Sequence, residues 1–170
     1  MKKFIGVKMI QATPMNRKEY NDYRGWELPA DENGADEGYL VEYEQSETSP
    51  NVNHPNHKGY ISWSPADVFV DAYRETVELT FGFAVEAMKK GYKVARKGWN
   101  GSNMFAVLSP GAKALPAKDF FNKDLASYAE NNGGAMDVRP AFMLKTAQDD
   151  VAYWAPSGSD CLAEDWFIVK

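Results

Sequence analysis

One short segment of this 170-residue chain gathers side chains that suit the binding of a small aromatic anion. Arg96, Trp99 and Asn100 lie within five residues of one another. An arginine can form paired hydrogen bonds with a phosphate, and an indole ring can stack on a base for about 1–3 kcal/mol. An asparagine offers a donor and an acceptor to a ribose hydroxyl or a base edge. None of these side chains is a nucleophile, so the segment favours binding over bond cleavage.

Each of these residues also has a structural interpretation, and the sequence leaves both open. Trp99 can be a core aromatic beside a turn, although the Asn-Gly that follows places it next to a loop. Arg96 can be a strand residue paired with Glu86 or Asp165. Asn100 can be a turn residue, because asparagine tolerates a positive φ.

Two adjacent carboxylates near the C-terminus, Glu164 and Asp165, invite a catalytic interpretation. General acid–base work would require an orienting partner and a shifted pKa, and the sequence indicates neither. Accepting hydrogen bonds from two ribose hydroxyls is the simpler functional role, and a surface acidic pair is the alternative. Arg139 is a second candidate for a phosphate contact. Lys145 and Thr146 end a strand near a turn, and either is a weaker candidate for a ligand contact.

The sequence lacks the familiar signatures of catalysis and cofactor binding, including phosphate-binding glycine loops and a serine nucleophile elbow. His54 and His57 are the only histidines, and no third or fourth zinc ligand lies nearby in the sequence. Cys161, the single cysteine, excludes an internal disulfide and is expected to be a free, partly buried thiol. We therefore expect no catalytic residue, no metal and no cofactor.

The charge is unevenly distributed along the chain. The net charge is −5, with 8 basic and 13 acidic residues in 1–76 but 11 of each in 77–170. The acidic half argues against binding of nucleic-acid polymers. A local basic cluster, Lys89, Lys90, Lys93, Arg96 and Lys97, can still hold a small anion. No apolar run is long enough for a membrane span and no signal peptide is visible, so we expect a cytoplasmic protein without membrane contact.

Residues 96–100, called the binding segment below, require a small antiparallel sheet to position them. Thr80 and Gly91 bracket a predicted helix over 81–90 with one apolar stripe. Strands are expected at 92–97, 104–108, 139–146, 151–154 and 166–169, as an antiparallel meander. Residues 112–138 read as an insertion that is partly helical around 117–128.

The front half predicts a second small module. Strands are expected at 3–12, 39–43 and 59–63, with helices at 16–23, capped by Asn16, and at 64–73, capped by Ser64. The connection 46–58 is polar and contains two prolines, so its tip is expected to be mobile. The sequence thus predicts an α+β fold with two modules: an accessory one over 1–76 and a binding one over 77–170, in which one main helix packs on the sheet.

Three motifs in the second module resemble those of a known family. Residues 81–101 follow the pattern Phe-Gly-(x4)-Ala-(x3)-Gly-(x2)-Val-Ala-Arg-Lys-Gly-Trp-Asn-Gly, and Met-Leu-Lys-Thr-Ala and Leu-Ala-Glu-Asp-Trp follow at 143–147 and 162–166. Together they resemble the phage-encoded Thoeris anti-defence protein two family over about residues 78–170. The first module, which shorter members of that family lack, looks like a segment of phage proteins to which we can attach no activity.

The resemblance implies a sponge for immune signals that acts in the cytoplasm of the infected bacterial host. Family members bind the glycocyclic ADP-ribose isomer of the Thoeris system without cleaving it, and some also bind CBASS cyclic dinucleotides in a separate pocket. They form homotetramers with ligand sites at subunit interfaces. On this basis the expected ligand-binding residues are Phe81, Arg96, Trp99, Asn100, Met104, Arg139, Thr146, Glu164 and Asp165.

Two other functions remain open from the sequence. One is an enzyme that degrades the same signals, with Glu164 or Asp165 as a general base. The other is a virion or host-interaction module in which Trp26, Trp63 and Trp99 line a protein interface.

Overall fold

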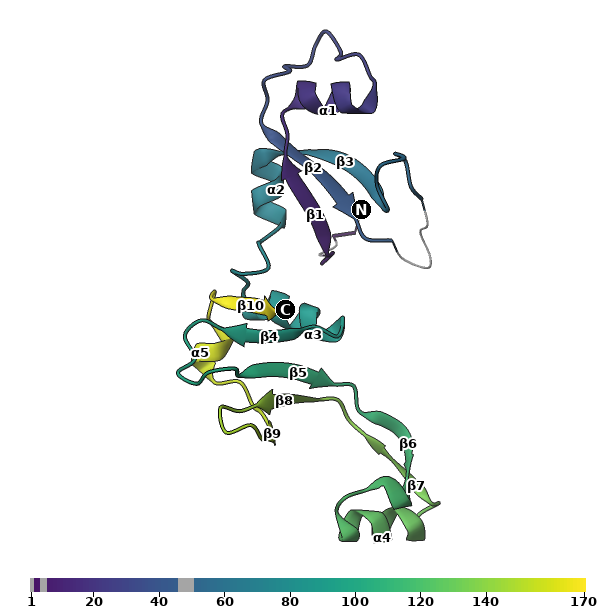
Figure 1. Ribbon diagram of the computed structural model, residues 1–170. Coiled ribbons are helices and arrows are strands. Elements are labelled where there is room, and N and C mark those ends of the chain that lie inside the picture. The colour runs from purple at the N-terminus through teal and green to yellow at the C-terminus, as the bar shows by residue number, and fades with distance from the viewer. Residues whose placement is uncertain (1, 4–5, 46–50) are drawn as a thin grey trace. The chain divides into compact units, whose positions relative to one another are not determined.

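The computed structural model describes residues 2–3, 6–45 and 51–170. The chain divides into two compact units, Met1–Arg74 and Glu75–Lys170 (Figure 1). Each unit combines antiparallel strands with short helices, which confirms the predicted α+β class.

The first unit is built on a three-stranded antiparallel sheet with the order β1-β2-β3. Its strands are β1 (Ile10–Pro14), β2 (Gly38–Tyr43) and β3 (Tyr60–Pro65), and its helices are α1 (Arg17–Arg24) and α2 (Ala66–Ala72). Tyr20 of α1 is buried with Leu40 and Ile61 of the sheet. The core of this unit is therefore formed by one helix and two strands.

The sequence predicted some elements of this unit correctly and misplaced the ends of others. Asn16 caps α1 as predicted, in a capping box with Glu19. The expected strand over 3–12 begins only at Ile10 in the described residues, which leave out 4–5. Ser64 does not cap α2, because β3 continues through Pro65 and the helix starts at Ala66. The predicted mobility concerns the tip of the connection 46–58, of which residues 46–50 lie outside the described residues.

The second unit contains a five-stranded antiparallel sheet with the order β10-β4-β5-β8-β9. The strands are β4 (Lys93–Arg96), β5 (Phe105–Ser109), β8 (Ala141–Lys145), β9 (Val151–Tyr153) and β10 (Trp166–Val169). The predicted meander is wrong in its last step, because β10 crosses to the far edge and pairs with β4. Leu79 holds it there, since Leu79 and Trp166 exchange both backbone hydrogen bonds on the outer side of β10.

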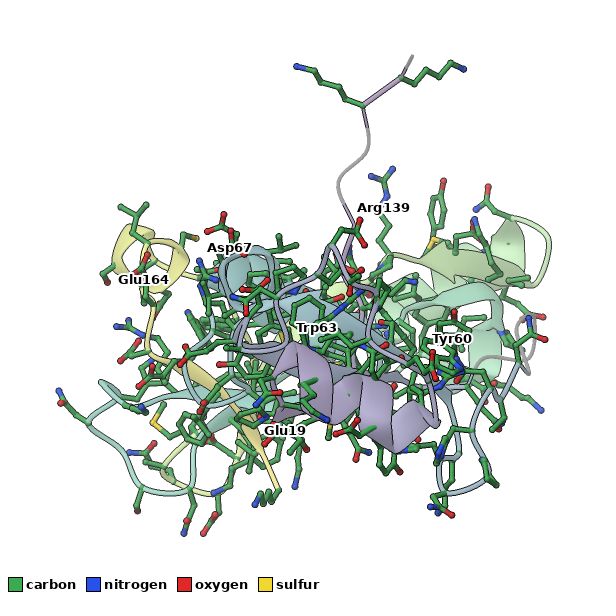
Figure 2. The ribbon with its side chains drawn as sticks, turned by 90° about the horizontal axis from the view of Figure 1, so that it is seen from above. Glu19, Tyr60, Trp63, Asp67, Arg139 and Glu164 are labelled. Atoms are coloured by element: carbon green, nitrogen blue, oxygen red, sulfur yellow. The ribbon has the colours of Figure 1, made fainter. Side chains whose placement is uncertain are left out.

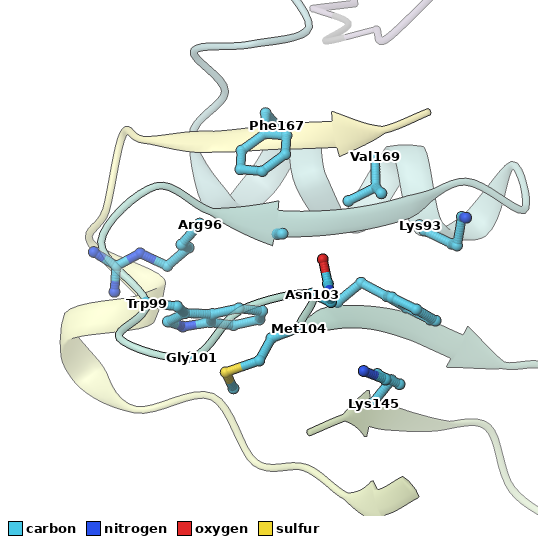
Figure 3. Close-up of a pocket in the computed structure, with 11 residues that line it drawn as sticks. Lys93, Arg96, Trp99, Gly101, Asn103, Met104, Lys145, Phe167 and Val169 are labelled. Atoms are coloured by element: carbon cyan, nitrogen blue, oxygen red, sulfur yellow. The ribbon is translucent and has the colours of Figure 1, made fainter. Parts of the chain in front are cut away.

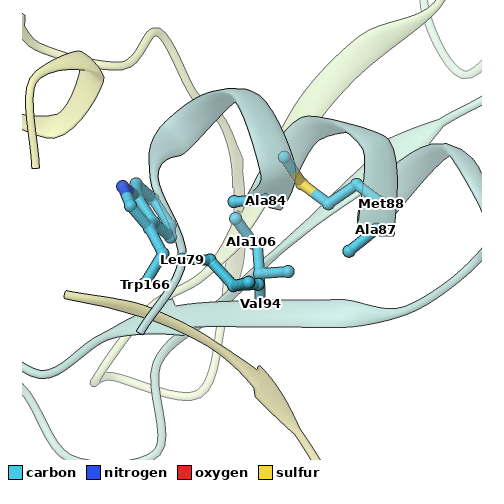
Figure 4. Close-up of a cluster of buried hydrophobic side chains, with 7 residues drawn as sticks. All are labelled: Leu79, Ala84, Ala87, Met88, Val94, Ala106 and Trp166. Atoms are coloured by element: carbon cyan, nitrogen blue, oxygen red, sulfur yellow. The ribbon is translucent and has the colours of Figure 1, made fainter. Parts of the chain in front are cut away.

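Helix α3 (Phe81–Lys89) covers one face of this sheet (Figures 1 and 4). It begins after Thr80, whose side chain makes no capping hydrogen bond, and it is followed by Gly91 with a φ of 89°. Its apolar stripe packs on β4, β5 and β10. The buried cluster consists of Leu79, Ala84, Ala87, Met88, Val94, Ala106 and Trp166.

The insertion at 112–138 forms an arm that leaves the sheet between β5 and β8 (Figure 1). The arm consists of the paired strands β6 (Ala112–Pro116) and β7 (Ala135–Val138), a 3-10 turn (Ala117–Asp119) and α4 (Lys123–Asn131). The sequence predicted the helix but missed the strand pair. The reason is local: Ala114 has a φ of 49° and the register shifts there, so no regular alternation marks β6.

A second element that the sequence missed is α5 (Gly158–Cys161), a single turn just before β10. Ser157 caps it and forms a capping box with Asp160. Its four residues are too few to give an amphipathic period, so only the cap carried a signal.

Candidate functional site

A pocket of about 520 Å³ lies on the face of the five-stranded sheet opposite α3 (Figure 3). Successive side chains of a strand point to opposite faces. Val94 therefore faces the α3 core, while Lys93 and Ala95 face the pocket. The volume lies in the range of small-molecule sites. The lining residues are Lys93, Ala95, Arg96, Trp99, Gly101, Asn103, Met104, Phe105, Lys145, Phe167 and Val169.

The pocket has two chemically different ends. Figure 3 shows Trp99 and Met104 at one end and Lys93 and Lys145 toward the other. The Lys93 ammonium lies 5.3 Å from the centre of the Phe105 ring, within cation–π range. Lys145 is 19% exposed and pairs with the well-exposed Asp149. The site therefore offers aromatic and apolar surface together with positive charge.

Trp99 is a core aromatic that also reaches the pocket. Its ring packs edge-on against Trp154 and Trp166, with centroids 5.8 and 5.3 Å away, and so belongs to the α3 side of the core. It also lines the pocket. Its indole Nε1 donates a hydrogen bond of 3.2 Å to Oδ1 of Asp160. The packing against the two tryptophans and the hydrogen bond to Asp160 together hold the Trp99 ring in one orientation.

The Arg96 guanidinium is engaged by two carboxylates. Its Nε donates to Oδ1 of Asp165 at 2.8 Å, and its Nη1 donates to Oδ1 of Asp160 at 2.9 Å. These hydrogen bonds raise the pKa of Arg96 above its usual value, Asp165 contributing most. The guanidinium is directed toward α5 (Figure 3). The pairing with Asp165 is the structural alternative stated for Arg96, and the residue borders the pocket without presenting a free charge to it.

The two neighbouring carboxylates of the C-terminal motif have different surroundings. Asp165 accepts hydrogen bonds from Arg96 and, at 2.7 Å, from the backbone N–H of Gly98. The Arg96 hydrogen bond has the largest effect on its pKa and lowers it. Glu164 is exposed to solvent. Asp165 is therefore part of the scaffold that shapes the turn after β4.

The structure brings together three of the nine expected ligand-binding residues at the pocket: Arg96, Trp99 and Met104. Phe81 packs in the α3 core, where its ring contacts Trp154 and Trp166. Asn100 is exposed and outside the lining.

The remaining expected residues do not line the pocket. Thr146 hydrogen-bonds to Asp150 in the turn between β8 and β9. Arg139 is exposed in the short connection between β7 and β8, well away from Glu164 (Figure 2). The positive φ that sequence reasoning considered for Asn100 occurs instead at Asn103, which has a φ of 55° and lines the pocket.

The sequence missed Asp160, which is 8% exposed and connects α5 to the pocket. Burial is the largest single influence on its pKa and raises it, but hydrogen bonds from Ser157, Arg96 and Trp99 outweigh burial and lower the pKa to about 2. The only local signal was the Ser157 capping box. Lys93 was expected as a member of the local basic cluster and Lys145 as a weak candidate for a ligand contact, and both line the pocket.

Other reactive side chains take different roles. In the first unit, His57 lies between Glu42, 2.7 Å from its Nδ1, and Tyr23, 2.8 Å from its Nε2. Among the described residues no three His, Cys, Asp or Glu side chains gather to hold a metal ion. Cys161 is free but exposed, so the expected partial burial of its thiol is wrong. In the described part of the chain no helix has the length and apolarity to span a membrane.

The three sequence motifs noted above meet at this site. Asp165 of the C-terminal motif binds Arg96 and the Gly98 N–H of the first motif. A Cβ atom on Gly101 would lie 2.4 Å from the Met104 sulfur and 2.8 Å from the Ala147 side chain, so a side chain at this position would displace Met104 or Ala147. The motifs are therefore one structural unit, whose close contacts restrict residue choice.

Comparison with known proteins agrees with the family resemblance of the three motifs. The family model of the Thoeris anti-defense 2-like domain matches residues 79–169, which contain every residue that lines the pocket. Thoeris anti-defense 2 of Bacillus phage SP01 is 39% identical over 97 residues, covering 55% of this chain and 97% of that protein. These matches confirm the expected family. The chain therefore belongs to the Thoeris anti-defense 2-like family, a family of anti-defense proteins.

Proposed function

We propose that this protein counters Thoeris defence by binding the glycocyclic ADP-ribose signal and holding it uncleaved. Family membership supports action against Thoeris. The observation that supports binding of the signal is the pocket, which has a volume of about 520 Å³ and is lined by aromatic side chains and two lysines. A signal of this class carries an adenine ring and two phosphates, so it needs both kinds of contact.

The chemistry of the pocket suggests how the ligand is oriented. Trp99 provides an indole at one end, on which the adenine stacks. Lys93 and Lys145 then bind the phosphates through charge-assisted hydrogen bonds. A sponge acts by mass action, so its Kd must be about nanomolar, or about −12 kcal/mol, to hold the free signal below the threshold of its effector.

Holding without cleavage is supported by the state of the acidic groups beside the pocket. The pKa of Asp160 is lowered to about 2, and that of Asp165 is also lowered. Both carboxylates accept hydrogen bonds from Arg96, so neither is poised to exchange a proton near neutral pH. Glu164, the other candidate base, is exposed and does not line the pocket.

The proposal includes assembly into a homotetramer. The pocket face of the sheet carries Phe105, Phe167 and Val169, with α3 on the opposite face. At the sheet edge, Val151 and Tyr153 of β9 are 64% and 81% exposed. Apolar sheet surface of this kind is normally covered. Light scattering of the purified protein tests the assembly, and a monomer at micromolar concentration would contradict it.

The experiment that tests the function separates retention from cleavage. The full-length protein is incubated with glycocyclic ADP-ribose and filtered, and the retained fraction is heat-denatured and chromatographed. We expect the signal to leave the filtrate and to be recovered unchanged. A new product would indicate an enzyme. Signal that stays in the filtrate would overturn the proposal for this ligand, and cyclic dinucleotides would then be tested in the same way.

A substitution at Trp99 tests whether the pocket is the binding site. Trp99→Ala removes the indole and should abolish retention of the signal while leaving the oligomer intact by light scattering. Trp26→Ala is the matched control, because Trp26 is 51% exposed and belongs to the first unit. Unchanged affinity of Trp99→Ala would remove Trp99 from the site.

A further inference from the structure

Asp160 is the point at which α5, Arg96 and Trp99 are joined, and its two carboxylate oxygens have separate partners. Oδ2 accepts hydrogen bonds from the Ser157 backbone N–H at 3.0 Å and from the Ser157 hydroxyl at 2.7 Å. Oδ1 accepts from Arg96 at 2.9 Å and from the Trp99 indole at 3.2 Å. One oxygen thus caps the helix, and the other faces the binding segment.

The backbone of the same residue extends the connection to the core. The Asp160 carbonyl oxygen accepts a hydrogen bond of 3.0 Å from the indole of Trp166, which is fully buried. Trp166 in turn packs against Trp99. Asp160 therefore contacts both tryptophans, one through its side chain and one through its backbone.

We propose that Asp160 is a positioning residue for ligand binding: its Oδ1 fixes the Trp99 indole at the pocket, and Arg96 serves as the counter-ion that allows this carboxylate to be buried. This inference rests on the proposed function for its ligand, but the hydrogen bond itself can be tested without one. It assigns Arg96 to the scaffold. The ligand anion is left to Lys93 and Lys145.

The physical argument concerns the freedom of the indole. Without a partner for its Nε1, the Trp99 ring is held only by its packing against Trp154 and Trp166 and loses the restraint on its edge. A stacking surface loses affinity when binding must first order it. A charged acceptor gives a stronger hydrogen bond than a neutral one. Burial of an unpaired carboxylate would be costly, and Arg96 removes that cost. The Asp160 carboxylate and the Arg96 guanidinium are therefore required together.

The first test is Asp160→Asn in the full-length protein, with glycocyclic ADP-ribose titrated by calorimetry. Loss of the charged acceptor should weaken binding by about 10- to 100-fold. The accompanying structural readout is the Trp99 indole N–H, which is identified among the five tryptophans by its absence from Trp99→Phe. In Asp160→Asn this proton should exchange faster with solvent than in the wild type.

Ser157→Ala is the matched control, because it removes the hydroxyl that binds Oδ2 but leaves Oδ1 untouched. It should lower the melting temperature, yet change the affinity by no more than about twofold and leave the Trp99 indole exchange unchanged. A large loss of affinity in Ser157→Ala would mean that α5 stability, and not the orientation of Trp99, controls the pocket.

A double-mutant cycle decides whether Asp160 acts through Trp99. Trp99→Phe keeps an aromatic ring but loses the donor. Adding Asp160→Asn to it should then weaken binding by no more than about a further twofold. Full additivity would overturn the proposal, as would wild-type affinity in Asp160→Asn. If Asp160→Asn does not fold, wild-type affinity in Trp99→Phe overturns it instead.

Failure of the proposed function would look different. A wild-type protein that does not bind the signal would refute the sponge. The exchange rate of the Trp99 indole in Asp160→Asn would still decide whether Asp160 holds Trp99: faster exchange supports the positioning role, and an unchanged rate overturns it.

Discussion

Lys93 and Lys145 are the pocket cations that a ligand anion can reach most readily. Arg96 is bound by two carboxylates, whereas Lys145 pairs with a single carboxylate, Asp149, whose side chain is 85% exposed. Lys93→Gln or Lys145→Gln should each weaken binding of glycocyclic ADP-ribose by about tenfold, because each removes a charge-assisted hydrogen bond. The dependence of affinity on salt should become shallower. Calorimetry at two ionic strengths measures both effects.

Lys89→Gln serves as the control for these variants. Lys89 lies at the end of α3, on the other face of the sheet, and pairs with Glu86 at 2.6 Å. Its substitution should leave the affinity unchanged. Equal losses in all three variants would show a general electrostatic effect and would contradict specific phosphate contacts from Lys93 and Lys145.

The acidity of Asp160 predicts a pH dependence of stability. Its pKa falls from 3.8 to about 2 on folding, so the folded state favours the ionised carboxylate. This stabilisation, about 2 kcal/mol, is fully present above pH 4 and is lost as the pH falls toward 2. Urea unfolding of the wild type between pH 5 and 2 should show the loss. Asp160→Asn should have a flatter profile in this window, and an unchanged slope would contradict the assignment.

Gly91 ends α3 in a conformation that only glycine adopts without strain. Its φ is 89°, and a Cβ atom there would meet no atom within 4 Å, so backbone strain is the only cost of a side chain. Gly91→Ala should reduce the free energy of unfolding by about 1 kcal/mol. Gly158→Ala at the start of α5 also meets open space but has no positive φ, and should be neutral or slightly stabilising. Equal effects would contradict this explanation.

The elements that the sequence predicted are those with their own local signals. Asn16 and Glu19 marked the start of α1, and the apolar stripe and Gly91 marked α3. Strand β6 and helix α5 were missed because one is irregular and the other is a single turn. The path of β10 also could not be predicted, because its position depends on backbone pairing with Leu79, far away in the sequence.

The candidate site was predictable to a similar extent. The spacing of Arg96 and Trp99 located one end of the pocket. One carboxylate partner of Arg96, Asp165, was among the sequence alternatives. The other, Asp160, was not, since it lies 64 residues further along the chain and only the folded sheet brings the two together. Sequence reasoning therefore found a segment that borders the pocket but could not distinguish an arginine that binds a ligand from one that supports the site.

The division of the chain matches the extent of its relatives. The family model covers 79–169, inside the unit Glu75–Lys170, and the Bacillus phage protein is matched over nearly its whole length. The core of that unit draws only on its own residues, from Leu79 to Trp166. The pocket likewise takes all its lining from Lys93 to Val169. The unit Met1–Arg74 has a separate core around Tyr20, Leu40 and Ile61.

A fragment of residues 75–170 should consequently fold by itself and bind glycocyclic ADP-ribose with an affinity within about twofold of the full-length protein, as expected for independent units. Thermal unfolding tests its cooperativity, and the filtration experiment tests its binding. The fragment 1–74 is the control and should retain no signal. A folded 75–170 fragment that does not bind would show that the first unit contributes to the ligand site, which would contradict the assignment of sequestration to the second unit.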